Sequence, residues 1–507
     1  MPQTTLVGDE GSGTPRTQRV LLMLLILATA CAVFWKLGSG SLAAWDEAIY
    51  AQVAKEMAQG GDWLTPHWSY QVWFEKPPLL IWVTACFFRL FGVSEFWARA
   101  ASALSGIGVV LLTYSMGARV YSRRVGLLAA VVLLTGYHFL SFARFGTMEV
   151  MLTLFICLAV DAYTRVRAGQ EKYWYLVWTA CALALLTKGA GGLIAPALIV
   201  LAVAFDRQVG EALRSKHFRL GALLCVLLVA PWHLVMYARY GSDFTGEYLG
   251  YHVLARTTRT LEGHPTGYLY FVGRLLDGFF PWCLLVPFAL VSGLRETLKG
   301  ERRAGIFLLL FGLVFSVYTL IPTRRPWYIV PLYPALSILI AALIVKLYRA
   351  AQGRALYRRL VAAACVVLVI AAASYSVLSL YLNRRGDDSA AQLAWQARRL
   401  SPADREPLVA FSEGSEAEPF DAQTLLFYSD RPVEQAYADH LPANDDAKRY
   451  VSYSKLSDLI ETSPGRIILR QEDVQRLSAK YELQVLAQAG SLVYATIKRK
   501  ETKGEPQ

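Results

Sequence analysis

Long apolar runs recur between Val20 and Leu382 and restrict what this chain can fold into. A helix of about 20 apolar residues is long enough to cross the hydrocarbon core of a bilayer. Hydrophobic residues make up 55% of the 507 positions, and a soluble protein cannot bury so many runs in one core. The pattern therefore predicts a mostly α-helical, polytopic membrane protein.

Eleven segments are expected to cross the membrane as helices. They are 20–36, 98–118, 125–142, 150–164, 173–187, 190–205, 219–236, 269–291, 305–321, 327–345 and 360–382. A further apolar segment, 77–92, is short and carries Arg89. We expect it to lie along the membrane surface as an interfacial helix, and residues 47–58 to form a second such helix.

The basic connectors between the spans predict the orientation of the chain. Cytoplasmic loops of membrane proteins carry an excess of Lys and Arg. With the N-terminus in the cytoplasm, five connectors with this excess fall on the cytoplasmic face. They are 118–124, 165–172, 206–219, 295–303 and 346–359. Because the number of spans is odd, we expect the C-terminus on the outer face.

Three parts follow along the chain. They are a cytoplasmic tail (1–19), a transmembrane domain (20–382) with a first outer loop at 37–97, and an outer C-terminal domain (383–507). That last domain alternates short apolar strands ("PLVAF", "RIILR", "SLVYATI") with helix-like stretches ("AQTLLFY", "EDVQRLSAKY"), which predicts a small α/β domain. It holds 17 Lys and Arg against 20 Asp and Glu, so the net charge of +12 comes from the membrane part and does not indicate nucleic-acid binding.

The predicted topology sends most conspicuous charged residues to the outer face. Ionisable groups at membrane depth are costly and are usually functional. A mixture of carboxylates and cations suits a substrate that has a phosphate and a group that needs a base. The residues are Asp46, Glu47, Glu75, Lys76, Arg144, Glu149, Lys188, His252, Arg256, Arg259, Glu262, His264, Arg324 and Arg325.

Seven short motifs follow one another in the order of a known family. They are "WDEAIYAQVAKEM", "GDWLTPHW", "FEKPPLLIW", "LLTKG", "HVLAR", "GYLYFV…FPW" and "RRPWYIVPLYPAL". Over about residues 20–345 the chain resembles the GT-C membrane glycosyltransferases, and more narrowly the aminoarabinose transferases of lipid A and the related protein mannosyltransferases. The paired "DE" and the "FEKPPL" motif are the most specific part, whereas the C-terminal domain resembles the family's periplasmic domain only loosely.

The resemblance implies a GT-C fold and an inverting transfer reaction. Such enzymes pass a sugar from a polyprenyl-phosphate donor, such as undecaprenyl phosphate, to an acceptor on the periplasmic face of the bacterial inner membrane. The acceptor could be lipid A, another envelope glycan or a protein, and the sequence leaves both the sugar and the acceptor open. Membrane lipids are expected partners, nucleic acid is not, and no cofactor is required.

The resemblance also implies roles for five residues. Asp46 matches the catalytic carboxylate of the family. Lys76 and Lys188 match cations near the donor phosphate. Arg256 lies in the loop segment that contacts this phosphate, and Tyr328 falls where the family keeps a phosphate-contacting tyrosine.

Other polar residues are expected to support these five. His252 lies in the phosphate-contacting loop segment, and Glu149 stands where relatives often have an aspartate. Glu47 and Glu75 each lie next to a residue of the predicted site. Glu75 and His252 could hold a divalent metal ion, since carboxylate and imidazole are suitable ligands, but two ligands do not define a site. His252 and His264 could equally be ordinary loop histidines.

The same residues have plainer interpretations. Asp46 could be the N-cap of the helix that follows it. Lys76 could anchor an interfacial helix, and Lys188 could extend its ammonium group to the lipid headgroups. Arg324 and Arg325 could bind lipid phosphates.

Two other functions compete with sugar transfer. A transporter or flippase of a phosphorylated polyprenyl lipid would place charges at mid-membrane in broken helices, often in repeated halves. Here the charges crowd one face. A noncatalytic scaffold would leave the clustered carboxylates and lysines unexplained. We therefore expect an enzyme, a glycosyltransferase.

Overall fold

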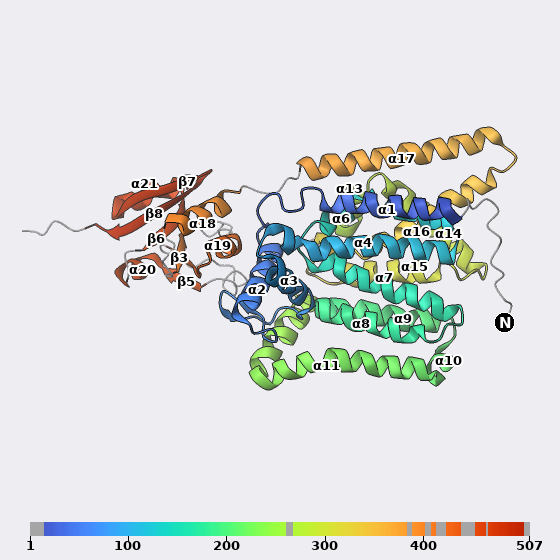
Figure 1. The fold of residues 1–507 in the computed structure, drawn as a ribbon, viewed down its shortest axis with the longest axis horizontal. Helices are drawn as coiled ribbons and strands as arrows, with labels where there is room; N and C mark the ends of the chain where they lie inside the picture. Colours follow the sequence, from blue (N-terminus) through green and yellow to red (C-terminus); the bar gives the residue numbers. More distant parts are fainter. Residues whose placement is uncertain are drawn as a thin grey trace, which may run out of the picture. The chain divides into compact units, whose positions relative to one another are not determined.

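The chain consists of two compact units, shown in the ribbon of Figure 1. The computed structural model describes residues 15–259, 267–382, 388–400, 407–411, 422–437, 452–462 and 465–500. The first unit comprises Met1–Leu37, Phe74–Val83 and Arg99–Arg384, and the second comprises Gly38–Trp73, Thr84–Ala98 and Arg385–Gln507. Two helices, α3 (Leu79–Phe91) and α4 (Glu95–Val120), contribute residues to both units.

The first unit is helical throughout its described part. Its α-helices are α1 (Pro15–Phe34), α5 (Arg123–Leu134), α6 (Tyr137–Ala143), α7 (Met148–Arg167), α8 (Tyr173–Lys188), α9 (Ile194–Phe205), α10 (Val209–Arg214), α11 (Lys216–Phe244), α12 (Arg256–Thr258), α13 (Tyr270–Gly278), α14 (Val286–Leu298), α15 (Gly305–Leu320), α16 (Leu332–Ala350) and α17 (Ala355–Leu382). Between them lie the 3₁₀ turns η1 (Gly189–Leu193), η3 (Trp282–Leu285) and η4 (Pro326–Ile329), and the π-helix η2 (Thr245–Ala255).

Each of the eleven segments expected to cross the membrane coincides with helix. Within the described residues, five helices are long and apolar enough to span a bilayer, or up to seven if each of two bent pairs is one span. Three shorter apolar helices lie at Arg19–Phe34, Leu79–Phe91 and Gly305–Leu320. The chain is therefore a multi-pass membrane protein, and the number of eleven spans stays a prediction.

Two of the expected spans are broken and not continuous. α5 and α6 meet at an angle of 73°, and α13 meets the helix Trp282–Leu298 at 120°. Gly136 lies in the first break. Pro281 lies in the second break, where its ring removes a backbone donor that a continuous helix would use.

The surface of α17 matches a lipid environment. Only 11% of its most apolar stretch is buried within the protein. Leu360, Val366, Val367 and Ile370 are each more than half exposed. Exposed apolar surface on this scale is typical of a helix covered by acyl chains.

The second unit contains a mixed sheet flanked by helices. Its elements are α2 (Asp46–Gly60), β1 (His67–Trp68), β2 (Gln71–Val72), α18 (Ser389–Leu400), β3 (Leu408–Phe411), α19 (Ala422–Ser429), β4 (Val433–Tyr437), β5 (Ser452–Lys455), α20 (Leu456–Thr462), β6 (Arg466–Arg470), α21 (Gln471–Lys480), β7 (Tyr481–Ala489) and β8 (Leu492–Arg499). Within the described residues the order of the large sheet is β5-β4-β3-β6-β8-β7. β3 pairs in parallel with β4 and β6, β4 pairs in parallel with β5, and β8 is antiparallel to β6 and β7.

The small α/β domain expected at the C-terminus is present. The predicted strands correspond to β3, β6 and β8, and the predicted helices to α19 and α21. Alternate side chains of the strands point into one core, which contains Phe411, Ile467, Leu469, Val493 and Ile497. The apolar alternation did not mark β4, β5 and β7, since the first two contain few apolar residues ("VEQAY" and "SYSK") and β7 is largely exposed.

The first outer loop differs from its expected arrangement. We expect residues 37–97 to belong with the transmembrane domain, whereas 38–73 and 84–98 pack in one unit with the C-terminal residues. The helix expected at 47–58 exists as α2, but it has no exposed polar face, because every residue from 47 to 58 is buried. An interfacial helix needs such a face, so this part of the expectation is wrong.

Polar residues of α2 are buried because each has a specific partner. The Lys55 ammonium donates to the carbonyl oxygen of Phe427 at 2.6 Å and pairs with Asp430. Glu56 accepts hydrogen bonds from the Gln52 amide at 2.8 Å and from a backbone N–H at 2.9 Å. Burial lowers the pKa of Lys55 and raises that of Glu56. These contacts attach α2 to α19 and to the β1–β2 hairpin.

Asp161 organises the basic ends of α4 and α7. Its carboxylate accepts from Arg119 at 3.0 Å, from Arg165 at 3.2 Å and from Ser115 at 2.8 Å. Asp161 is buried, so these charge-assisted hydrogen bonds replace its lost hydration. The basic connectors that predict the cytoplasmic face are thereby tied to the helix bundle.

Removing the charge of Asp161 should therefore destabilise the helical unit. We expect Asp161→Asn to lower stability by about 2–3 kcal/mol, the scale of hydrogen bonds to charged groups. Asp277→Asn is the matched control, because Asp277 is exposed, lies 3.8 Å from Arg274 in a weak ion pair, and accepts from the hydroxyl of Tyr375 at 3.1 Å. Thermal unfolding of both purified variants in one detergent checks this. Equal midpoints would show that the Asp161 network contributes nothing.

Candidate active site

A buried ion pair joins two of the predicted site residues. Lys188 is the last residue of α8, and Glu149 lies in the first turn of α7. A short connection makes these two helices antiparallel neighbours, so that the end of one meets the start of the other. The Lys188 ammonium donates to Glu149 Oε1 at 2.7 Å, and the side chains are 12% and 4% exposed. The plainer interpretation, a lysine extended to the lipid headgroups, does not fit this burial.

Two tyrosines complete this group. The Lys188 ammonium lies over the ring of Tyr328, 5.0 Å from its centre, and is attracted by the negative face of the ring. The Tyr328 ring is 4.6 Å from that of Tyr318. We call Glu149, Lys188, Tyr318 and Tyr328 the lysine cluster. The second carboxylate oxygen of Glu149 is buried and makes no hydrogen bond within the described part of the chain. Such an acceptor is rare in a native interior.

Gly189 brings a second segment next to the lysine cluster. Its φ of +52° favours glycine, and a Cβ there would lie 2.5 Å from the Tyr248 hydroxyl and 3.5 Å from Pro77. Pro77 follows Lys76 directly, just as Gly189 follows Lys188. The two predicted phosphate-binding lysines therefore come from segments that touch.

Glu75 and His252 are neighbours in the structure. The Lys76 ammonium is 3.6 Å from Glu75 Oε2, and His252 Nε2 is 3.9 Å from Glu75 Oε1. Glu247 is 4.0 Å from the same histidine nitrogen. We call Glu75, Lys76, Glu247 and His252 the histidine cluster. His252 and Glu247 come from the π-helix η2, a conformation that is frequent at functional sites.

Other predicted residues flank these clusters along the chain. Arg256 begins α12, four residues after His252, and is half-buried. Arg324 donates to the carbonyl oxygen of Thr319 at 2.7 Å and lies over the ring of Tyr268. Glu262 and His264 lie outside the described residues.

The predicted two-residue metal site gains little support. Across the residues that the structure describes, no group of three or more His, Cys, Asp or Glu side chains is arranged to hold a metal ion. The distance between His252 Nε2 and Glu75 Oε1 is 3.9 Å, and two such side chains do not by themselves define a metal site.

Asp46 and Glu47 open α2 in the second unit. The N-cap of α2 is Trp45 and not Asp46, so the capping interpretation of Asp46 is wrong. Asp46 is half-buried. Glu47 is fully buried, and its carboxylate accepts from the backbone N–H of Ala43 at 2.8 Å. Trp45 has a φ of +67°, and a bulky residue held in this region is a common sign of a functional constraint.

Sequence reasoning missed Tyr318, Glu247 and the strain at Trp45. Tyr318 lies near the end of an apolar helix that contains several other aromatic residues, so the sequence does not distinguish it from them. Glu247 precedes the recognised histidine motif by several positions. No spacing rule predicts a positive φ at a tryptophan.

The two clusters share one chemical capacity. Two lysines held in place by carboxylates, with an arginine nearby in sequence, are suited to bind an anionic group such as a phosphate. The rings of Tyr318 and Tyr328 surround Lys188 with less polar groups, which strengthens such contacts.

The sequence of the chain is similar to those of several known proteins. A sequence model of the family described as dolichyl-phosphate-mannose-protein mannosyltransferase matches residues 75–235. A protein of Aquifex aeolicus is 31% identical over 329 residues, which cover 64% of this chain and 74% of that one. The undecaprenyl phosphate-alpha-4-amino-4-deoxy-L-arabinose arabinosyl transferase of Pectobacterium carotovorum is 29% identical over 68% of this chain. The match spans 63% of the length of that transferase, a little under two thirds.

Solved structures share the fold. ArnT from Cupriavidus metallidurans bound to undecaprenyl phosphate superposes with a TM-score of 0.75 at 20% identity, over 98% of this chain and 100% of that one. The oligosaccharyltransferase of Archaeoglobus fulgidus in the apo form gives 0.61 at 10% identity, over 97% and 75%. Taken with the sequence relatives, these matches show that the chain belongs to the GT-C membrane glycosyltransferases of the ArnT and protein mannosyltransferase type.

Proposed function

We propose that the chain is an inverting glycosyltransferase that moves a sugar from a polyprenyl-phosphate donor to an acceptor of the cell envelope. The observation that carries this proposal is the lysine cluster, a buried cation–carboxylate–tyrosine group beside the segment that contains Lys76. The names of the relatives support it, since several are transferases of undecaprenyl-phosphate-linked aminoarabinose. The similar ArnT structure contains undecaprenyl phosphate.

Lys76, Lys188 and Arg256 would bind the donor phosphate, together with Tyr328. The phosphate gains negative charge as the bond to the sugar breaks, and cations already in position stabilise that charge without reorganisation. Glu149 holds the Lys188 ammonium in place. Its second oxygen would accept a hydrogen bond from a hydroxyl of the donor sugar, which explains a buried acceptor with no hydrogen bond.

Asp46 would be the general base that accepts the proton of the acceptor hydroxyl. In an inverting transfer the nucleophile approaches the anomeric carbon opposite the leaving phosphate, so the base and the phosphate-binding cations act on opposite sides of that carbon. Asp46 comes from α2, and the cations come from later parts of the chain. Glu47, Glu75 and His252 would support the site by positioning.

The proposed location is the bacterial inner membrane. The N-terminus would be cytoplasmic, and the site and the C-terminal domain would face the periplasm, where lipid A, another glycan or a protein is the acceptor. We propose that no cofactor is required, with a divalent cation at Glu75 and His252 as the alternative. The comparisons do not favour the transporter alternative, because the named relatives are transferases.

Removing the buried charges of the lysine cluster should lower the rate of transfer strongly and the melting temperature only slightly. In the double variant Lys188→Met with Glu149→Gln no unpaired charge is left buried, so we expect a near-native melting temperature. Transfer should fall by about 10²–10³-fold, the effect of removing one preorganised donor to developing charge. The matched control is Lys346→Met with Glu296→Gln, which removes a lysine–glutamate pair of 3.0 Å whose lysine is exposed. Full activity in the first double variant would reduce the cluster to a structural pair.

The function itself is tested by comparing envelope molecules in cells with and without the protein. Mass spectrometry of lipid A, envelope glycans and proteins should reveal one acceptor that loses a sugar when the protein is absent. Asp46→Asn should behave like the deletion in cells. With purified protein and EDTA present it should lower transfer by about 10²–10⁴-fold, the usual contribution of a general base.

Glu47→Gln is the matched control for Asp46→Asn. A glutamine oxygen can still accept from the backbone N–H of Ala43, so this variant should stay active. Identical envelopes in the presence and absence of the protein would contradict the proposed function. Full transfer by Asp46→Asn would remove Asp46 from the mechanism.

A further inference from the structure

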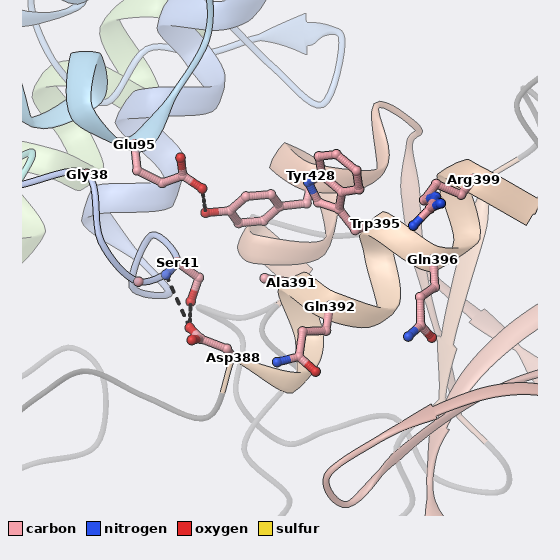
Figure 2. Close-up of a pocket in the computed structure, with 11 residues that line it drawn as sticks. Gly38, Ser41, Glu95, Asp388, Ala391, Gln392, Trp395, Gln396, Arg399 and Tyr428 are labelled. Atoms are coloured by element: carbon pink, nitrogen blue, oxygen red, sulfur yellow. Dashed lines mark hydrogen bonds between the residues drawn. The ribbon is translucent and has the colours of Figure 1, made fainter.

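The second unit contains a pocket that is separate from the residues assigned to transfer. Figure 2 shows its lining side chains, which come from residues 38–41, the start of α4, the helix α18 and the helix α19. Its volume of about 490 Å³ falls in the usual range for small-ligand sites, about 300–1,000 Å³. None of its lining residues belongs to the lysine or histidine cluster.

One wall of the pocket is a single face of α18. Residues Gln392, Trp395, Gln396 and Arg399 recur every three or four positions, so they lie on one side of the helix. The opposite side carries buried aliphatic residues of the core. Trp395 is 56% exposed at this wall, although an indole ring of this size is normally buried when it has only a structural role.

The other wall presents two carboxylates in fixed positions. Tyr428 donates to Glu95 Oε1 at 2.9 Å, and Ser41 donates to Asp388 Oδ1 from its backbone N–H at 3.2 Å and from its hydroxyl. Figure 2 shows both contacts as dashed lines. These contacts hold Glu95 and Asp388 through one carboxylate oxygen each. The buried Oε1 atom of Gln396 makes no hydrogen bond within the described part of the chain.

This combination points to a neutral, hydroxyl-rich ligand. Two carboxylates against the single guanidinium of Arg399 disfavour a phosphate or another polyanion by like-charge repulsion. Positioned acceptors and primary amides suit the hydroxyl groups of a sugar. An exposed indole ring offers an apolar plane on which the C–H face of a sugar ring can stack.

We propose that this pocket binds a saccharide unit of the acceptor glycan, at a site separate from the transfer chemistry. The identification of the saccharide with the acceptor rests on the proposed function. The binding of a saccharide does not, because it follows from the lining of the pocket alone.

Binding can be measured on the full-length protein in lipid nanodiscs, with sugar-based detergents removed. The probe is the oligosaccharide released by mild acid from the envelope of the cells that express the protein. Saturation-transfer NMR should show magnetisation passing to its ring protons. Trp395→Ala should weaken binding about tenfold or more, the scale of a central tryptophan contact. Leu400→Ala should leave it unchanged, because Leu400 is also 56% exposed on α18 but lies outside the pocket.

A transfer assay separates the two parts of the proposal. Trp395→Ala should raise the KM for the acceptor about tenfold and leave kcat and the KM for the donor unchanged. Oligosaccharide binding that depends on Trp395, in a protein without transferase activity, would support the pocket and contradict the proposed function. An unchanged acceptor KM would overturn the role in acceptor binding. Equal oligosaccharide binding by wild type and Trp395→Ala, or none at all, would overturn the pocket itself.

Discussion

A charge buried among apolar helices is stable only when it is paired, and the bond between Lys188 and Glu149 satisfies this constraint at the candidate site. The pair exists because α7 and α8 are antiparallel neighbours, so that the end of one helix meets the start of the other. Gly189 then gives the chain a tight turn with no side chain to keep the Lys76 segment away. The predicted phosphate-binding lysines thus depend on one helix pair and one glycine.

Charged side chains buried in the second unit are paired as well. α2 is buried on all sides, and its Lys55 and Glu56 each have a partner among nearby segments. The segment that contains Asp46 and α2 therefore packs in one unit with the C-terminal domain. If Asp46 is the base, the C-terminal domain is needed to hold it. The saccharide pocket on α18 would give the same unit a role in selecting the acceptor.

The sequence predicted those features that follow from local pattern. Apolar runs indicated the helices, and alternation indicated β3, β6 and β8. The order of the motifs predicted Glu149, Lys188 and Tyr328 as site residues. Their contacts with one another depend on how the helices pack, which cannot be predicted from the pattern of one sequence. The burial of Lys55 on α2 was not predictable, because its partners Phe427 and Asp430 follow in the chain more than 300 positions later. The sequence did not predict Trp395 as a pocket residue, since one tryptophan on a helix is usually part of a core.

The central claim is a single displacement at the sugar, with the polyprenyl phosphate as leaving group. The most direct measurement is the anomeric configuration of the product, determined by NMR coupling constants after transfer from a polyprenyl-phosphate donor of known configuration. The account predicts an inverted product and one free polyprenyl phosphate for each sugar transferred. A product of retained configuration, or transfer without release of polyprenyl phosphate, would contradict it.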